Sequence, residues 1–325
     1  MVMVEGLVST IIPVFNRPRL LGEAVASVLA QSWRPLEIII VDDGSTDDTP
    51  QVAADLARSN PAEIRLIRKT NAGPGPAREA GRLAARGEFI QYLDSDDLLL
   101  PDKFLLQVTG LRSSPECGVS YGMTRFVGEG QEPQDIPWKR TGERLERMFP
   151  SMLASRWWGT STPLYRRSVL DKAGPWLSLV NEEDWEYDCR IAAQGVRLQQ
   201  VTQFVSTERD HGGSRLSRGG SQDPAKLRSR VRAHALILAH AQGAGITHEV
   251  AEMRRFAREL FLLCRQCGAA GLPRESAELF ALARRASGPK RGEARDFRLY
   301  GLLTRLFGWS AMGRLFCLLD RMRPR

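Results

Sequence analysis

The feature that most constrains the fold is an alternation of short apolar runs and helical segments through about the first 110 residues. Each apolar run is too short for a helix and stops at a polar turn, as a buried strand does. Between the runs, apolar residues recur three and four positions apart, as on one face of a helix. The predicted strands span residues 7–15, 36–41, 63–67 and 88–93. This alternation predicts an α/β fold built on a doubly wound, mostly parallel sheet.

Polar side chains follow each of the four predicted strands. Asn16 follows the first, Asp42 and Asp43 follow the second, Asn71 follows the third, and residues 94–97 follow the fourth. Ligands of such sheets bind beyond the carboxyl ends of the strands, so these clusters predict one binding site. The glycine fingerprint of dinucleotide-binding folds is absent from the first turn, which counts against a dehydrogenase.

Asp94 and Asp96 are spaced one residue apart on the loop after the fourth strand. Two carboxylates on an extended turn can direct oxygen ligands at one Mg²⁺ or Mn²⁺ ion and leave positions open for a diphosphate. The alternative is a solvated acidic turn. The position at the end of a predicted strand favours the metal.

Asp43 ends the second strand, where an acidic side chain can accept hydrogen bonds from a base or a ribose. The alternative is a capping sequence for the next helix, with Ser45 or Thr46 as the cap. The two roles are compatible, because Asp43 belongs to the strand end and the cap to the following turn.

Five segments together resemble family 2 glycosyltransferases of the GT-A fold. They are VSTIIPVFNR (8–17), SVLAQSW (27–33), EIIIVDDGSTDDT (37–49), NAGPGPARE-G (71–81) and GEFIQYLDSDD (87–97). The resemblance extends over roughly residues 6–215 and implies a catalytic domain over residues 1–220. It implies an enzyme that moves one sugar from a nucleotide diphosphate, with a UDP-sugar as the expected donor, to an acceptor hydroxyl with inversion. Synthesis of cell-surface polysaccharides or glycoconjugates is the expected setting.

The resemblance also implies roles for individual residues. The expected nucleotide-binding residues are Pro13, Phe15, Asn16, Asp43, Arg78, Asp94 and Ser95. The expected ligands of Mn²⁺ or Mg²⁺ are Asp94, Asp96 and His211. His211 lies in a glycine-rich loop between Arg209 and Arg215, and either arginine could hold phosphate oxygens. The alternative for His211 is an ordinary loop histidine.

Residues 181–185 open a predicted helix that continues to residue 194 and resemble the family's Glu-Asp motif. An inverting transfer needs a base, because the attacking acceptor hydroxyl must lose its proton. The resemblance implies Asp184 in this role, with Glu183 as the second candidate. The alternative is that acidic residues are simply favoured at a helix N-terminus by its dipole.

The C-terminal third is basic and helical. Residues 221–325 carry 20 Lys and Arg against 9 Asp and Glu, whereas the rest of the chain has a net charge of −3. Predicted helices span residues 227–242, 247–268, 274–285 and 297–319. Apolar residues interleaved with arginines over 297–325 suit a helix in a membrane interface. The alternative is a helix packed on the preceding ones, with its arginines in solvent.

Other features of the sequence predict the cellular compartment and the partners, and they leave alternative functions open. Five cysteines without a framework spacing indicate a reducing compartment, and the first strand begins too early to leave room for a signal peptide, so a cytoplasmic protein, peripheral on the inner membrane face, is expected. Trp157 and Trp158 suit either sugar stacking or a core. The expected partners are a nucleotide-sugar and a carbohydrate or lipid-linked acceptor, without nucleic acid. The rival functions are a nucleotidyltransferase and a nucleotide-sugar-binding module without catalysis.

Overall fold

The computed structural model describes residues 3–210 and 223–322, and these form two compact units. The sheet unit comprises residues 3–148, 156–178 and 195–210. The helical unit comprises residues 149–155, 179–194 and 223–322. The domain boundary at residue 220 stays a prediction, and the two units are defined by contacts alone.

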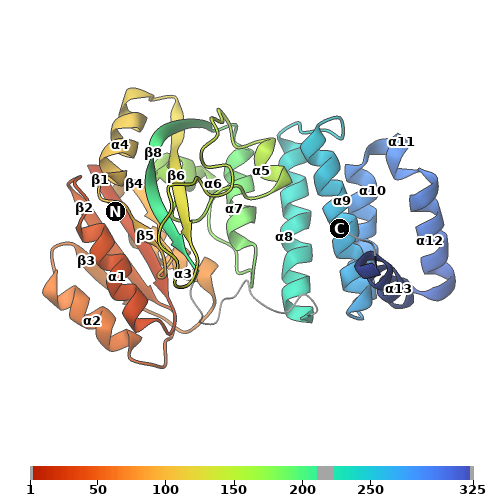
Figure 1. Cartoon of the computed structure of the whole chain (residues 1–325), viewed down its shortest axis with the longest axis horizontal. Helices are drawn as coiled ribbons and strands as arrows, with labels where there is room; N and C mark the ends of the chain where they lie inside the picture. The colour runs from red at the N-terminus through yellow and green to blue at the C-terminus, as the bar shows by residue number, and fades with distance from the viewer. Residues whose placement is uncertain (1–2, 211–222, 323–325) are drawn as a thin grey trace. The chain divides into compact units, whose positions relative to one another are not determined.

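The sheet unit is built on a mixed sheet of eight strands (Figure 1). The strands are β1 (Val4–Val14), β2 (Leu36–Asp42), β3 (Ile64–Arg68), β4 (Gly87–Tyr92), β5 (Leu98–Leu99), β6 (Cys117–Val127), β7 (Leu164–Arg166) and β8 (Arg197–Arg209). Their order is β3-β2-β1-β4-β7-β6-β8-β5. The first four pair in parallel, as predicted, and β7 continues the sheet antiparallel to β4.

Both faces of β1 and β2 are covered, which explains their continuous apolar sequences. The helices of this unit are α1 (Pro18–Leu29), α2 (Thr49–Ser59), α3 (Pro74–Ala84), α4 (Lys103–Ser113) and α6 (Arg167–Ala173). Ile12 and Ile40 pack in one cluster with residues of α1, α2 and α4. On the opposite face, Ile11 lies so close to Gly81 of α3 that a Cβ there would meet its Cγ2 at 2.3 Å.

The second half of the sheet unit is more regular than the sequence suggested. After residue 120 the sequence shows no regular strand pattern, yet most of β6 and all of β7 and β8 lie there. Their inward positions are partly polar: the Thr124 hydroxyl lies 2.6 Å from that of Thr162 and 2.9 Å from that of Ser206. A polar network of this kind removes the apolar alternation by which a strand is detected.

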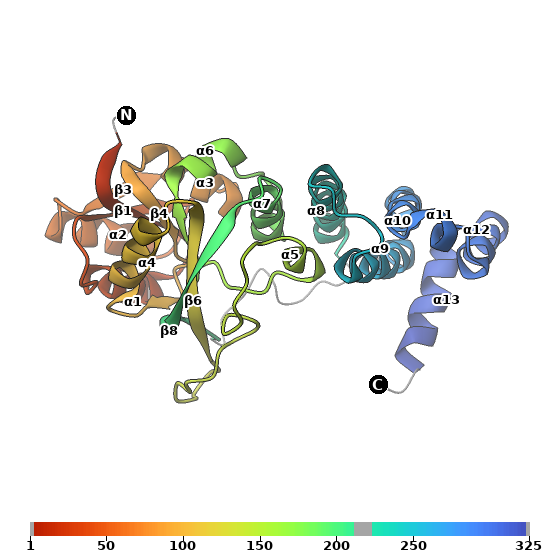
Figure 2. The ribbon, with the colours of Figure 1, turned by 90° about the horizontal axis from the view of Figure 1, so that it is seen from above.

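The helical unit contains α5 (Ser151–Ala154), α7 (Glu183–Ala192), α8 (Pro224–Gly243), α9 (Ala251–Ala269), α10 (Pro273–Ala286), α11 (Gly288–Gly292), α12 (Arg295–Phe307) and α13 (Trp309–Met322). Figure 2 shows α9 beside α10, and α13 also packs on α9. Gly268 and Gly313 allow that contact, because a Cβ on Gly313 would lie 2.4 Å from the backbone nitrogen of Ala269. Among the described helices, none is both long and apolar enough to cross a bilayer.

The prediction of a single helix over residues 297–319 is wrong. The chain breaks into α12 and α13 at Gly308, whose φ is 81°. Only glycine adopts this region without strain, and a glycine with positive φ is a common helix terminator. Cys264 and Cys267, the two cysteines of a C-x-x-C sequence, are buried in the helical unit.

Candidate active site

The loop after β1 is tied to the loop after β2 through Asn16. Its backbone has a φ of 53°, a region that asparagine tolerates better than most residues. The Asn16 side-chain oxygen accepts a hydrogen bond from the Thr46 backbone at 2.9 Å, and its backbone N–H donates to the Ser45 hydroxyl at 3.0 Å. Phe15 beside it is 45% exposed, whereas Pro13 lies within β1 opposite Val41.

Asp43 is buried at the end of β2 and holds the loop that follows β3. Its carboxylate accepts a hydrogen bond from Lys69 Nζ at 2.5 Å and from the Gly73 backbone N–H at 2.8 Å. The Ala72 backbone N–H donates to the same carboxylate at 3.1 Å. Asp43 therefore fixes one loop at the carboxyl edge of the sheet, and its predicted contact with a base stays a prediction.

Arg78 on α3 is buried beside the acidic loop after β4. Its guanidinium donates to Asp94 Oδ1 at 2.7 Å, and Cζ lies 4.9 Å from the centre of the Trp176 ring. Glu79, the neighbouring residue, accepts from the Trp176 backbone N–H at 3.2 Å and from Arg82. Sequence reasoning did not connect Trp176 with Arg78, because the two residues are 98 positions apart.

Besides Arg78, two further arginines hold the loop of residues 94–97 in place. Arg17 forms an ion pair with the Asp96 carboxylate. Arg209 Nε donates to the Asp96 backbone oxygen at 2.6 Å, and the Arg209 backbone N–H donates to Asp97 Oδ1 at 3.1 Å. Ser95 is buried in the loop. Sequence reasoning missed the role of Arg17, and Arg209 contacts this loop in addition to any phosphate role.

Asp97 shows how densely carboxylates are gathered here. Burial raises the pKa of Asp97 well above its ordinary value, and the negative charges of Glu208, Asp96 and Asp94 raise it further. A group of partly buried carboxylates offers the oxygen ligands that a hard divalent cation prefers.

The donor set for a metal is partial in the described residues. Within residues 3–210 and 223–322, no three His, Cys, Asp or Glu side chains are arranged to hold an ion by themselves. Asp94 and Asp96 supply two carboxylates, which fits an ion that completes its shell with phosphates and water. His211, the third predicted ligand, lies outside the described residues.

The predicted base lies in the helical unit, at the start of α7. Asp184 is half-buried, and its Oδ1 accepts a hydrogen bond from the Trp185 backbone N–H at 2.7 Å. Glu183 is buried. The structure therefore gathers Asn16, Asp43 and the 94–97 loop in one unit, and it places Asp184 and Glu183 in the other.

The paired tryptophans belong to the core of the sheet unit. Trp157 and Trp158 are buried, with ring centres 4.4 Å apart. Tyr121 packs against the edge of Trp157 at 5.2 Å. The sequence left two roles open for these tryptophans, stacking on a sugar and packing in a core, and the structure shows core packing.

Known proteins resemble this chain in sequence and in fold. An uncharacterized glycosyltransferase of Nostoc sp. is 32% identical over 212 residues, which cover 63% of this chain and 65% of the relative, just under two thirds of its length. Staphylococcus aureus TarS 1-349, solved in complex with UDP-GlcNAc, aligns with a TM-score of 0.69 at 19% identity and covers 94% of this chain and 89% of that one. The mannosyltransferase PcManGT of Pyrobaculum calidifontis, solved with GDP-Man and Mn²⁺, aligns with a TM-score of 0.53 at 18% identity and covers 95% and 86%.

Both structural matches share the fold that the sequence predicted. The model of Glycosyl transferase family 2 matches residues 9–172, which contain β1 to β4, the acidic loop after β4 and the buried tryptophans. That segment is half of the chain, and it includes Asn16, Asp43, Arg78 and the Asp94–Asp96 pair. The chain belongs to glycosyl transferase family 2.

Proposed function

We propose that this protein transfers one sugar from a UDP-sugar to an acceptor hydroxyl with inversion at the anomeric carbon. The observation that supports it most is the carboxyl edge of the sheet. There, Asp43 fixes one loop, Arg78 pairs with Asp94, and Asp96 follows on the same turn. The structures of TarS with UDP-GlcNAc and of PcManGT with GDP-Man support a nucleotide-sugar donor, and UDP-GlcNAc is the first donor to test.

In this proposal the chain's own residues bind and orient the donor. Asp43 and Asn16 shape the nucleoside pocket through the loops they hold, and Phe15 offers an exposed ring beside them. Asp94 and Asp96 would hold Mn²⁺ or Mg²⁺, which supplies positive charge for the departing diphosphate. Arg78 keeps Asp94 oriented through the 2.7 Å hydrogen bond.

Asp184 is the proposed general base. The acceptor oxygen must lose a proton as it attacks the face opposite the leaving diphosphate. Asp184 is half-buried, whereas Glu183 is buried, so Asp184 is the better placed of the two to meet an acceptor. The proposed acceptor is a carbohydrate or a lipid-linked glycan of the cell surface.

Hydrolysis of the donor tests the proposal without a known acceptor, because water can take the place of the acceptor hydroxyl. We expect slow release of UDP from UDP-GlcNAc that requires Mn²⁺ or Mg²⁺. Asp96→Ala should lower that rate by more than about 100-fold, since even residues behind a metal ligand are worth about 10- to 100-fold. The measurement is a coupled UDP assay across a metal titration.

The matched control is Asp55→Ala, which removes an exposed carboxylate that pairs only with its helix neighbours Arg58 and Gln51 in the sheet unit. It should hydrolyse the donor as the wild type does. Binding of UDP-GlcNAc without any metal-dependent hydrolysis would instead support a binding module without catalysis.

A second part of the proposal is contact with an anionic membrane surface through α12 and α13. Large apolar side chains are exposed along these helices: Leu299, Leu302, Leu306, Phe307, Leu315, Leu318 and Leu319. On α12 the exposed leucines follow helical spacing on one face, while Phe297 and Tyr300 pack against Phe261. Exposed arginines, among them Arg305 and Arg314, complement anionic headgroups.

Vesicle sedimentation tests this contact. The double variant Leu302→Glu with Leu306→Glu should lower binding to phosphatidylglycerol vesicles by at least about 10-fold, because each buried leucine contributes about 1.5–3 kcal/mol. The control is Leu83→Glu, at an exposed leucine of α3. A wild type that ignores the vesicles and dimerises through this face in light scattering would overturn the membrane proposal.

A further inference from the structure

The residue just before α7 has a strained backbone. Glu182 is the N-cap of α7 and has a φ of 61° and a ψ of 17°, two positions before Asp184. A residue with a Cβ pays a free-energy penalty in this left-handed region and keeps it only where its surroundings determine the conformation. Glu182 must therefore be held by other groups.

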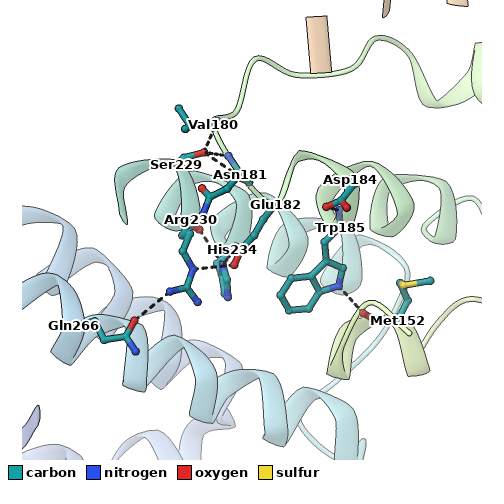
Figure 3. A network of polar contacts seen from close by, with 10 residues as sticks. All are labelled: Met152, Val180, Asn181, Glu182, Asp184, Trp185, Ser229, Arg230, His234 and Gln266. Atoms are coloured by element: carbon teal, nitrogen blue, oxygen red, sulfur yellow. Dashed lines mark hydrogen bonds and ion pairs between the residues drawn. The ribbon is translucent and has the colours of Figure 1, made fainter. Parts of the chain in front are cut away.

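Two side chains of α8 hold the Glu182 carboxylate (Figure 3). Arg230 Nε donates to Oε1 at 2.8 Å. His234 Nδ1 lies 3.0 Å from Oε2 and 2.9 Å from the backbone oxygen of Arg230. Burial alone would raise the pKa of Glu182, but the hydrogen bonds and charges of His234 and Arg230 hold that pKa below its ordinary value. Arg230 is itself fixed by a hydrogen bond to Gln266 of α9 at 3.1 Å.

Ser229 of α8 holds the backbone that leads into Glu182. Its hydroxyl oxygen accepts from the Val180 N–H at 2.9 Å and the Asn181 N–H at 3.3 Å, and it lies 3.2 Å from the Asn181 carbonyl oxygen, to which it donates. A hydroxyl has one donor and two acceptor sites, and all three of Ser229 bond to the backbone of Val180 and Asn181.

The residue that follows Asp184 is anchored as well. Trp185 Nε1 donates to the Met152 carbonyl oxygen at 2.7 Å. The Trp185 ring meets the His234 ring edge-on at 5.3 Å, and His234 stacks on Phe256 at 5.4 Å with the ring planes 12° apart. Asp184 therefore lies between two anchored residues, Glu182 and Trp185, and His234 contacts both of them (Figure 3).

We infer that Ser229, Arg230 and His234 of α8 are positioning residues for the general base Asp184. The inference rests on the proposed function and adds to it, since it gives the basic C-terminal region a part in sugar transfer. These side chains fix the segment from Val180 to Trp185 and thereby the direction of the Asp184 carboxylate.

A double-mutant cycle in the full-length protein tests the inference, with UDP-GlcNAc hydrolysis in Mn²⁺ as the readout. Arg230→Gln should lower kcat by about 10- to 100-fold, because a small misplacement of a catalytic group has an effect of that size. KM for UDP-GlcNAc and Kd for UDP should stay within about 2-fold. In an Asp184→Asn background the same Arg230→Gln change should alter kcat by no more than about 2-fold, since a residue that acts through Asp184 has nothing left to position.

Two further variants keep the test decisive. Arg228→Gln on the same helix removes a different ion pair, with Glu275 at 2.9 Å, and should keep the wild-type kcat. Ser229→Ala deletes one hydroxyl, so it should fold even if Arg230→Gln does not, and it should show the same dependence on Asp184.

The possible outcomes distinguish a failure of the positioning inference from a failure of the proposed base. Full additivity of Arg230→Gln and Asp184→Asn, or a normal kcat in both Arg230→Gln and Ser229→Ala, would overturn the positioning inference alone. If Asp184→Asn itself keeps the wild-type kcat, the assignment of the base in the proposed function is wrong, and the inference falls with it.

Discussion

At the scale of single residues, the candidate donor site consists of carboxylates that already have partners in the chain. Asp43 accepts hydrogen bonds from Lys69 and from the backbone of Ala72 and Gly73. Asp96 pairs with Arg17. These contacts fix the loops at the carboxyl ends of the strands before any ligand arrives, which lowers the conformational entropy that binding has to offset.

Glu186 on α7 makes the stability of the helical unit depend on pH. Burial alone would raise the pKa of Glu186, but hydrogen bonds from His240 at 2.9 Å and Arg190 at 2.7 Å lower that pKa. A lowered folded-state pKa stabilises the fold above the unfolded pKa of about 4.3, and this contribution is lost as the pH falls through the folded value. We expect the unfolding temperature to fall as the pH is lowered from about 5 to about 3, the range in which first the unfolded and then the folded state takes up this proton.

Glu186→Gln should reduce the slope of that dependence, because a neutral amide has no proton to gain. The measurement is a series of thermal melts followed by circular dichroism between about pH 3 and pH 7. A variant that keeps the full wild-type slope would show that the Glu186 carboxylate is not a source of the pH dependence.

At the scale of elements, the sequence predicted the first four strands well because their burial on both faces leaves an uninterrupted apolar run. It could not predict β6 and β8, where Thr124 and Ser206 face inward and bond to each other. The sequence also predicted α12 and α13 as one helix, because the apolar spacing continues across Gly308 and only the positive φ there ends the first helix. Local patterns report which face is buried, and they do not report polar networks between distant segments.

The contact between α9 and α13 depends on two glycines. Gly313→Ala would place a Cβ 2.4 Å from the Ala269 backbone nitrogen and 2.6 Å from the Gly268 carbonyl carbon, so the helices must separate. We expect a loss of about 1–3 kcal/mol in the free energy of unfolding, the usual range for overpacking. Urea denaturation measures it.

Gly243→Ala is the control for that prediction. Gly243 lies at the end of α8 with no heavy atom within 4 Å of an added Cβ. Alanine there should leave the stability unchanged or raise it slightly, because glycine is the poorer helix former. Equal losses in the two variants would contradict the close packing of α9 and α13.

At the scale of the whole molecule, the division into two units is the part that the sequence showed least. The Glu-Asp motif could be identified from the residues, but its partners Ser229, Arg230 and His234 are 48 to 52 positions away along the chain. Such pairings of distant segments are set by tertiary contacts, which no local pattern encodes.

The central claim is that Asp184 removes a proton during sugar transfer, and Asp184→Asn tests it most directly. Asparagine keeps the shape and cannot act as a base, so UDP release from UDP-GlcNAc in Mn²⁺ should fall by about 10²- to 10⁴-fold. Binding of UDP, measured by calorimetry, should be unchanged, and the control Asp296→Asn, at an exposed residue of α12, should hydrolyse the donor normally. A rate of UDP release in Asp184→Asn equal to that of the wild type would contradict the claim.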